Sequence, residues 1–501
     1  MAREGTRFYI TTAIDYVNGA PHIGHALEKV QADVIARYQR LKGREVFFGT
    51  GTDEHGAKIA RAAAKANKTP QEFVDEVSAV FTAMDKALDI SYDSFIRTTD
   101  KKLHWPAAAK MWKELEAKGD LYKKAYEGLY CVGHEAFITE KDLTKEGICE
   151  IHGAAPEVVK EENYFFRTSQ YTGHIKEAIR NGSFRIVPKE RENEIMALLE
   201  EGLEDVSFSR PSKDLSWGIP VPGDEEHTMY VWADALTSYL SAIGYAQETA
   251  QFKAFWPADV QVIGKDILRF HAAIWPAMLM SAVLPLPKVL LVHGFMSLNG
   301  QKISKSLGNV IDPFEVVARY GADATRYYVL AEIPTTQDGD FSYEKFEARY
   351  NADLALGLGN FVARVTTLGE RHIEDPLDIP MSPLASEEIS MRFGAYHARM
   401  EEFRFNEAIA EARSLIQFGD RRINETRVWE LPDRDPESFR QEMADMGHVA
   451  ATVAWMLLPI MPATATEILR RLGIDVSSTE KWVFRFTKGP SLFERRDKED
   501  Q

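Results

Sequence analysis

Residues 7–29, RFYITTAIDYVNGAPHIGHALEK, join a strand-like run to the start of an amphipathic helix. The run 7–14 is rich in β-branched and aromatic residues, which favours a β-strand, and so is EVFFGTGTD at 45–53. Between the two runs, apolar residues recur at helical spacing: Ile23, Leu27, Val30, Val34, Tyr38 and Leu41. A strand, a helix and a second strand in this order predict a β-α-β unit.

The same pattern returns later in the chain. VQVIGKD (260–266) and KVLLVHGF (288–295) have the composition of buried parallel strands, and the helix-like RFHAAIWPAMLMSAV (269–283) lies between them. The stretch 118–225 lacks this pattern and is rich in charge, glycine and proline, which indicates a module inserted between two α/β halves. From about residue 335 onward, helical apolar spacing dominates, as in Leu354, Leu358, Phe361, Val365 and Leu368.

Composition places the chain among globular proteins. Its 501 residues exceed one ordinary core, so several modules are expected, and 45% hydrophobic residues suffice to build them. No window approaches the roughly 20 apolar residues that span a bilayer, and the first residues lack the pattern of an export signal. The two cysteines fit a reducing compartment, so we expect a cytoplasmic location. Because the net charge is −16, any phosphate-rich partner must meet a local basic face.

Two histidines, His22 and His25, stand three residues apart at the start of the first predicted helix. Both rings then share one face of the first turn, where free backbone N–H groups and the helix dipole favour an anion. Other phosphate-binding loops are absent: no G-x-x-x-x-G-K-[ST] occurs, and GTGTDEHG (49–56) has Glu54 where a dinucleotide fingerprint needs glycine. The pair predicts a phosphate site, with a helix cap and a solvated ring as the alternative.

A second signal, GQKISKSLGN at 300–309, follows the strand-like run 288–295. Its glycines let the loop move, and it presents Lys302 and Lys305 to an anion. A mobile lysine loop together with a histidine pair suits a polyphosphate whose leaving group gains negative charge. Taken alone, the loop is better explained as a solvated basic loop, so the specificity comes from the two motifs together.

HIGH (22–25) together with KISKS (302–306) resembles the two signatures of class I aminoacyl-tRNA synthetases, with Ile303 where methionine is usual. Four further stretches resemble the methionyl-tRNA synthetase family in particular: AIDYVNGAPHIGH (13–25), GTDEHG (51–56), YVWADALTSY (230–239) and VIGKDILRFHAAIWP (262–276). The resemblance covers nearly the whole chain. It implies a Rossmann-like catalytic domain (1–117 and 226–334), a connective insert (118–225) and an all-α anticodon-binding helical bundle (335–501).

The resemblance also implies an activity: methionine reacts with ATP and Mg²⁺ to give methionyl-adenylate, and the methionyl group passes to the 3′ end of tRNA(Met). The catalytic residues would be His22, His25, Lys302 and Lys305. The methionine pocket would be lined by Ile14, Tyr16, Trp232, Ala235, Tyr239, Ile267 and His271, with Asp53 on the substrate ammonium. ATP would be bound by Glu28, Arg210, Gly264, Asp266 and Lys305. Without the family resemblance, core packing would be the preferred explanation for Trp232 and Tyr239. For Arg210, a surface salt bridge explains the residue as well as a contact with ATP does.

In the helical region, GLGNFVARV (357–365) places Asn360 and Arg364 four residues apart on one helical face, and NETRVWEL (424–431) contains Trp429. Amide, guanidinium and indole groups suit single-stranded RNA, whose bases are stacked and read on their edges. Both stretches resemble the family's anticodon-reading positions, which implies the CAU anticodon as target; an ordinary bundle surface is the alternative. The arginines that could supply a basic face here are Arg404, Arg413, Arg421, Arg422 and Arg427.

The insert contains two chelating pairs, Cys131-x-x-His134 and, after 14 residues, Cys149-x-x-His152. Two thiolates and two imidazoles make a neutral tetrahedral Zn²⁺ site. Related enzymes carry cysteine pairs in this insert, whereas this chain has histidine second in each pair. A zinc site and its alternative, two small buried thiols with solvated histidines, are therefore expected equally.

Other functions stay open at this point. Another class I synthetase, for leucine, isoleucine, valine or cysteine, shares both signatures, but the branched-chain enzymes carry a larger editing insert than 118–225 can hold. A nucleotidyltransferase with the same histidine motif explains residues 1–60 and 302–306 without tRNA, yet leaves the helical third unexplained. A non-catalytic RNA-binding relative is disfavoured because both signatures keep their ionisable residues. The chain ends on GPSLFERRDKEDQ (489–501), without room for a dimerisation module, so we expect a monomer.

Overall fold

The computed structural model describes residues 6–132, 136–138, 143–151, 153–298, 300–302, 310–476 and 482–496. The chain divides into two compact units. The first unit comprises Met1–Pro21, Lys42–Lys86 and Ile90–His293, and the second comprises His22–Leu41, Ala87–Asp89 and Gly294–Gln501. Among the described residues, no helix combines the length and the apolar character needed to cross a bilayer.

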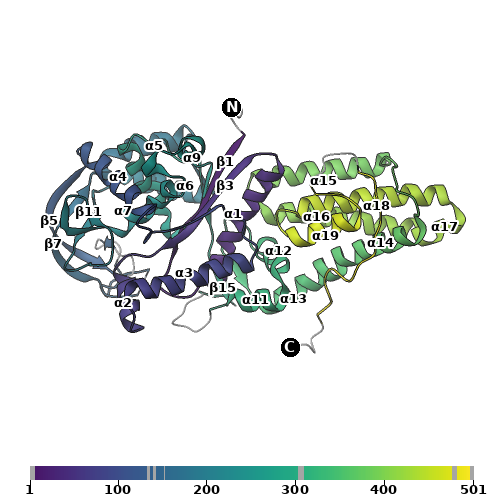
Figure 1. Ribbon diagram of the computed structural model, residues 1–501, viewed down its shortest axis with the longest axis horizontal. Helices are drawn as coiled ribbons and strands as arrows, with labels where there is room; N and C mark the ends of the chain where they lie inside the picture. Colours follow the sequence, from purple (N-terminus) through teal and green to yellow (C-terminus); the bar gives the residue numbers. More distant parts are fainter. Residues whose placement is uncertain are drawn as a thin grey trace. The chain divides into compact units, whose positions relative to one another are not determined.

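The first unit is built on a seven-stranded parallel sheet (Figure 1). Its strands are β1 (Arg7–Thr12), β2 (Asp15–Tyr16), β3 (Glu45–Asp53), β4 (Ser94–Arg97), β8 (Arg185–Val187), β13 (Val260–Gly264) and β14 (Val289–His293). They lie in the order β2-β3-β1-β13-β14-β8, and β4 also pairs with β3. All ladders are parallel, which confirms the α/β class expected from the sequence.

The central strands are short, apolar and buried along their whole length, as all five residues of β13 and of β14 show. Such strands occur where both faces of a parallel sheet are covered. Backbone packing is equally tight at the sheet edge, where a Cβ on Gly51 of β3 would lie 2.0 Å from the Ile96 carbonyl oxygen. Only glycine allows β3 and β4 to approach this closely.

Helices surround this sheet within the first unit, and three of the shorter segments are 3₁₀ turns. The α-helices are α2 (Ala57–Lys65), α3 (Pro70–Ala87), α4 (His104–Ala117), α5 (Thr172–Arg180), α6 (Lys189–Glu201), α7 (Val231–Leu236), α8 (Ser238–Ser241), α9 (Ala250–Phe255) and α10 (Trp275–Ser281). The 3₁₀ turns are η2 (Thr168–Tyr171), η3 (Tyr245–Gln247) and η4 (Lys265–Ile267). The helix predicted over 269–283 begins instead as a π-helix, η5 (Phe270–Ile274).

The stretch predicted as an insert, 118–225, contributes two small antiparallel sheets. One consists of β5 (Leu121–Cys131), β6 (Ala136–Ile138), β7 (Glu157–Phe166) and β9 (Val206–Ser207). The other consists of β10 (Ser209–Pro211), β11 (Pro220–Val221) and β12 (Asp224–Met229). However, β8 belongs to the same stretch and pairs with β14, so part of 118–225 completes the parallel sheet. The exact domain boundaries stay a prediction.

The second unit is mostly helical beyond residue 310 (Figure 1). Its helices are α1 (Ile23–Leu41), α11 (Pro313–Tyr320), α12 (Ala322–Glu332), α13 (Tyr343–Arg349), α14 (Asn360–His372), α15 (Pro383–Glu401), α16 (Phe405–Thr426), α17 (Leu431–Arg434), α18 (Pro436–Leu457) and α19 (Pro462–Arg471). The π-helix η7 (Tyr350–Gly359) and the 3₁₀ turn η8 (Val428–Glu430) interrupt them. A small sheet joins β15 (Met296–Leu298), β16 (Gln301–Lys302) and β17 (Gly339–Phe341).

The apolar stripe predicted for the helical region is buried at Leu354, Leu358, Phe361 and Val365. It crosses from the π-helix η7 into α14, so the spacing identified a helical face but not the wider turn. The long helices α15, α16 and α18 then pack against one another. This confirms a mainly helical region in the described residues, but it begins at about residue 343 and not at 335, because strand β17 lies at the predicted start.

Helix α1 carries the HIGH motif and groups with the helical region rather than with the parallel sheet. The Asp33 carboxylate lies 2.7 Å from an Arg326 guanidinium nitrogen, and both side chains are fully buried. Arg326 also donates to three backbone carbonyls, those of Leu88, Pro459 and Ile460. A buried ion pair needs such complete hydrogen bonding to offset its desolvation. The β-α-β order of the sequence predicted that α1 belongs to the sheet domain. Helical periodicity counts Asp33 as a surface residue, so it does not reveal the buried ion pair with Arg326.

Candidate functional site

The HIGH histidines lie in the second unit at the start of α1. Their rings stack with centroids 3.9 Å apart and planes 25° apart, which confirms that His22 and His25 share one face. Gly24 makes this possible, because a Cβ there would lie 3.0 Å from the His22 ring. The glycine of the motif therefore provides space for the first histidine.

Hydrogen bonds fix which ring nitrogens carry protons. The backbone N–H of His22 donates to His25 Nδ1 at 3.0 Å, and the N–H of Gly24 donates to His22 Nδ1 at 3.2 Å. Both Nδ1 atoms are acceptors, so each neutral ring has its proton on Nε2. The pair thus offers two Nε2–H donors of the kind that bind phosphate oxygens.

The expectation that free backbone N–H groups at this helix start bind an anion is wrong. The N–H of Ile23 donates to the Ile311 carbonyl at 3.1 Å, and that of His25 donates to the His22 carbonyl at 2.9 Å. The Gly24 N–H is used by the His22 ring. Because the first three N–H groups of α1 have internal partners, the predicted phosphate site rests on the imidazole rings and not on the backbone.

The structure describes only some of the other residues in the second unit that are predicted to contact ATP. Glu28 is buried on α1, one turn beyond His25. Lys302 ends strand β16, and only its backbone placement is described. Lys305 lies outside the described residues. The role of the lysine loop stays a prediction.

The predicted methionine pocket residues all fall in the first unit, and hydrogen bonds join three of them. The Tyr239 hydroxyl lies 2.6 Å from His271 Nε2, and His271 Nδ1 lies 3.0 Å from the Ile267 carbonyl oxygen. A carbonyl only accepts, so the His271 proton is on Nδ1 and the Tyr239 hydroxyl donates to Nε2. Burial lowers the pKa of His271 to about 4, so this ring is neutral at physiological pH.

Aromatic rings gather next to His271. Trp232 stacks on Phe270 with centroids 3.8 Å apart and planes 7° apart, and its ring is edge-on to His271 at 6.1 Å. Phe270 was not among the predicted pocket residues. It precedes His271 in the π-helix η5, a helix type that often marks functional sites. The π-turn, which sequence spacing does not reveal, brings both residues to Trp232.

The remaining pocket residues are linked by the sheet and by a cavity. Tyr16 and Asp53 are register partners across β2 and β3, and Asp53 is buried at the end of its strand. Ile14 and Tyr239 line one small cavity. Ala235 is buried on α7, one turn after Trp232. The structure therefore relates these pocket residues in pairs: Tyr16 with Asp53, Ile14 with Tyr239, and Ala235 with Trp232.

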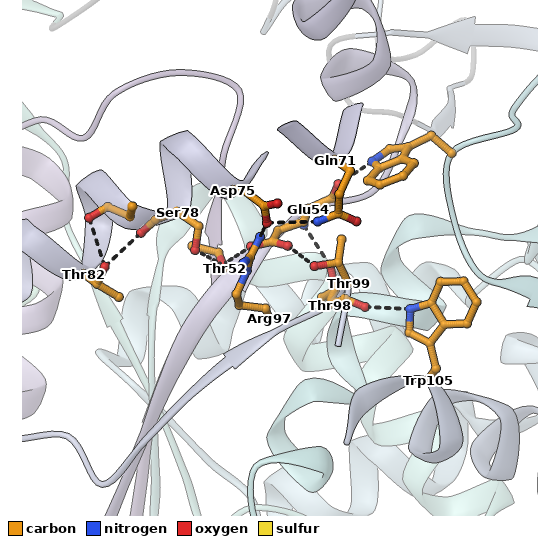
Figure 2. A network of polar contacts seen from close by, with 12 residues as sticks. Thr52, Glu54, Gln71, Asp75, Ser78, Thr82, Arg97, Thr98, Thr99 and Trp105 are labelled. Carbon is orange, nitrogen blue, oxygen red and sulfur yellow. Dashed lines mark hydrogen bonds and ion pairs between the residues drawn. The ribbon is translucent and has the colours of Figure 1, made fainter. Parts of the chain in front are cut away.

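The segment that carries Asp53 is held by a polar network (Figure 2). The Glu54 carboxylate is fully buried and accepts hydrogen bonds from Arg97 Nε at 2.6 Å and from the Thr99 hydroxyl. Arg97 also pairs with Asp75 at 2.6 Å. In the sequence Glu54 only marked the absence of a dinucleotide fingerprint; in the structure it anchors the residue next to Asp53.

Two predicted ATP residues of the first unit adjoin each other. A Cβ on Gly264 would lie 2.7 Å from Asp266 Oδ1, so glycine is needed for the carboxylate to occupy this position. Arg210, in contrast, forms a two-pronged ion pair with Glu161, at 2.7 and 2.6 Å, and lies over the Tyr130 ring at 4.3 Å. This pairing favours the salt-bridge alternative for Arg210, and its contact with ATP stays a prediction.

The anticodon candidates of the second unit meet through Arg364. Its guanidinium donates to Asp420 Oδ1 at 3.0 Å and to Asn424 Oδ1 at 2.6 Å, and both partners lie on α16. The two predicted stretches, 357–365 and 424–431, are thus in direct contact. Trp429 follows in η8 with 45% of its surface exposed, and Asn360 is exposed at the start of α14.

The basic face expected from nearby arginines is largely neutralised. Ion pairs join Arg404 to Glu407, Arg413 to Asp353, Arg422 to Glu442 and Arg427 to Glu430. Among the described residues, no ion pair involves Arg421. Counting arginines overestimated the positive potential because each of these four has an acidic partner, three residues on for Arg404 and Arg427 and farther away in the chain for Arg413 and Arg422.

The zinc candidates are described only in part. Cys131 and Cys149 are buried in one small apolar cluster with Ile138. His134 and His152 lie outside the described residues. Within the described part of the chain, no group of three or more potential metal ligands occurs. The structure therefore brings the two thiols of the predicted site into one cluster.

Comparison with known proteins agrees with this arrangement. A family model described as tRNA synthetases class I (M) matches residues 8–147 and 139–366. The methionine–tRNA ligase of Thermotoga maritima is 42% identical over 478 residues, which cover 94% of this chain and 76% of that protein. The methionine–tRNA ligase of Brucella suis is 41% identical over 488 residues, which cover 96% of this chain and 94% of that protein.

A solved structure shows the same fold. Methionyl-tRNA synthetase from Mycobacterium tuberculosis in complex with methionyl-adenylate matches with a TM-score of 0.92 at 35% identity, covering 98% of this chain and all of that one. The apo form of that enzyme matches with a TM-score of 0.86 at 32% identity. The family model matches residues 8–366, and sequence identity and fold extend over nearly the whole chain, so the chain belongs to the methionine–tRNA ligases, a family of class I tRNA synthetases.

Proposed function

We propose that the chain activates methionine with ATP to methionyl-adenylate and transfers the methionyl group to the 3′ end of tRNA(Met). The observation that carries this proposal is the joined set Trp232, Tyr239 and His271 in the first unit. It is supported by the relatives' names and by the methionyl-adenylate complex of the M. tuberculosis enzyme.

The chemistry of the pocket suits an unbranched thioether. Sulfur interacts favourably with aromatic edges and is only a weak acceptor, so it needs apolar walls and no charge. Trp232 and Phe270 provide the aromatic surface. His271 is neutral because burial lowers its pKa, and its proton points to a carbonyl rather than into an apolar ligand. Asp53, at the end of β3, supplies a carboxylate for the substrate ammonium.

In the first step the methionine carboxylate attacks the α-phosphorus of ATP and pyrophosphate leaves. The Nε2–H groups of His22 and His25 donate to phosphate oxygens as negative charge develops. Lys302 and Lys305 offset the charge of the departing pyrophosphate, and Mg²⁺, which arrives with ATP, also neutralises phosphate charge. Glu28, Gly264 and Asp266 hold the ATP ribose. Arg210, which pairs with Glu161 in the structure, is the proposed contact of the phosphate tail. In the second step a terminal ribose hydroxyl of tRNA attacks the acyl carbon and AMP leaves.

Anticodon reading is assigned to Asn360, Arg364 and Trp429. The exposed indole of Trp429 is available to stack on an unpaired base. Asp420 and Asn424 hold the Arg364 guanidinium in one orientation. A fixed guanidinium discriminates base edges better than a mobile one, because less side-chain entropy is lost on binding.

Charging of tRNA(Met) tests this assignment. Trp429→Ala should lower kcat/KM for charging by about tenfold or more, since one base-stacking contact is lost. Methionine-dependent exchange of pyrophosphate into ATP, measured without tRNA, should be unchanged. Leu384→Ala on α15, also an exposed apolar side chain, is the matched control and should affect neither assay. If Trp429→Ala lowered activity equally in both assays, a role of Trp429 in tRNA recognition would be ruled out.

The proposed phosphate site is tested at the glycine between the histidines. In Gly24→Ala the new Cβ displaces the His22 ring by a few tenths of an ångström. Adenylate formation in a single-turnover assay should slow by about tenfold, because small misplacements of catalytic groups are costly. Gly394→Ala, in a helix with nothing near the new Cβ, should leave the rate unchanged. An unchanged rate in Gly24→Ala would contradict the role of the stacked pair.

We also propose that Cys131, His134, Cys149 and His152 bind one Zn²⁺. Thiolates and imidazoles are preferred zinc ligands, and burial of both thiols in one cluster supports a shared ligand. The bound ion would crosslink β5 to the segment around residue 149 and so stabilise the small sheet.

Metal analysis of protein purified without chelator should find about one zinc per chain. Cys149→Ser should lose the metal and lower the thermal stability. Zinc content near zero in the parent protein, measured under reducing conditions, would leave the two thiols as an ordinary apolar cluster.

A further inference from the structure

We propose that Asp234 is a positioning residue that ties the segment carrying Asp53 to the two helices lining the methionine pocket. This inference rests on the proposed function, because it assigns a purpose to a group next to the proposed substrate residues. Asp234 itself was not among the predicted site residues.

Asp234 lies between two histidines in the interior of the first unit. His55 Nδ1 is 2.6 Å from Asp234 Oδ2, and His104 Nε2 is 2.5 Å from Asp234 Oδ1. All three side chains are at most 2% exposed. Each carboxylate oxygen thus accepts one imidazole N–H, which satisfies a group that is costly to bury unpaired.

The three residues come from segments that carry proposed methionine contacts. His55 follows Asp53 by two residues in the 52–56 segment. Asp234 lies on α7 between Trp232 and Ala235. One carboxylate therefore connects the proposed ammonium-binding segment to the helix that carries the aromatic wall.

The second histidine extends the connection to α8. His104 Nδ1 lies 2.9 Å from Ser241 Oγ, and α8 also carries Tyr239. The Ser241 hydroxyl also donates to the Thr237 carbonyl at 3.0 Å. His104 thus joins Asp234 of α7 to Ser241 of α8 through its two ring nitrogens.

Charge keeps this network in place. Burial alone would raise the pKa of Asp234, but the charge of His55 and the hydrogen bonds from both histidines outweigh it, and the pKa is lowered. An ionised carboxylate between two imidazoles is held more strongly than a neutral acid. Glu54 fixes the same segment through Arg97 (Figure 2). Asp53 is thus followed directly by two anchored residues, Glu54 and His55.

The inference predicts a selective loss of methionine binding. In Asp234→Ala the KM for methionine in pyrophosphate exchange should rise by about tenfold, while the KM for ATP should change by less than about twofold. Asp234→Asn keeps the volume and one acceptor oxygen, so it should recover part of the loss. If Asp234→Ala does not fold, Asp234→Asn provides the same comparison of the two KM values.

A matched control separates positioning from general stability. Asp120 is also a buried carboxylate of the first unit, and it accepts hydrogen bonds from the Tyr171 and Ser281 hydroxyls. Asp120→Asn should lower the thermal stability and leave the KM for methionine unchanged. An equal rise of the methionine KM in Asp120→Asn, or parallel rises of both KM values in the Asp234 variants, would overturn the inference.

The two histidines provide a second comparison. His55→Ala should raise the KM for methionine more than His104→Ala, because only His55 shares a segment with Asp53. The reverse order would contradict a connection through His55. If the parent protein shows no methionine-dependent exchange, the proposed function fails; if it does and the Asp234 variants behave like the parent, only the positioning role fails.

Discussion

The cost of burying a carboxylate governs how the first unit holds its proposed substrate residues. A buried charge persists only when hydrogen-bond donors or an opposite charge surround it. The segment 52–56 meets this requirement twice, with Glu54 paired to Arg97 and His55 paired to Asp234 (Figure 2). Both pairs link this segment to elements far away in the chain. The end of β3 is therefore held by polar contacts as well as by the sheet.

The second unit depends on the same constraint at another place. Arg326 is fully buried and balances Asp33 of the HIGH helix while it donates to backbone carbonyls near residues 88 and 460. The helix that carries His22 and His25 is consequently part of one compact unit with the helices that carry Arg364 and Trp429.

Much of this could be predicted from residue patterns. Runs rich in β-branched and aromatic residues located β1, β3, β13 and β14, because these strands are buried along most of their length. The i and i+3 spacing placed His22 and His25 on one face. Family resemblance found the residues Tyr239 and His271, which the structure joins by a hydrogen bond.

Other features depend on partners that no local pattern contains. Asp33, Glu54 and Asp234 resemble surface residues in the sequence, yet each is buried by a partner from a distant segment. Phe270 reaches Trp232 only because η5 is a π-helix, and helical periodicity assumes an α-helix. The N–H groups of α1 are occupied because Ile311 and the His22 ring accept them. Hydrophobic periodicity predicts which apolar side chains are buried. It does not predict which polar side chains are buried together with a polar partner.

The central claim is that this pocket selects methionine for reaction with ATP. The most direct test is amino-acid-dependent exchange of labelled pyrophosphate into ATP, run without tRNA and with each proteinogenic amino acid in turn. We expect exchange with methionine alone. Exchange with another amino acid would contradict the pocket assignment, and no exchange with any of them, from folded protein with Mg²⁺, would contradict adenylate formation itself.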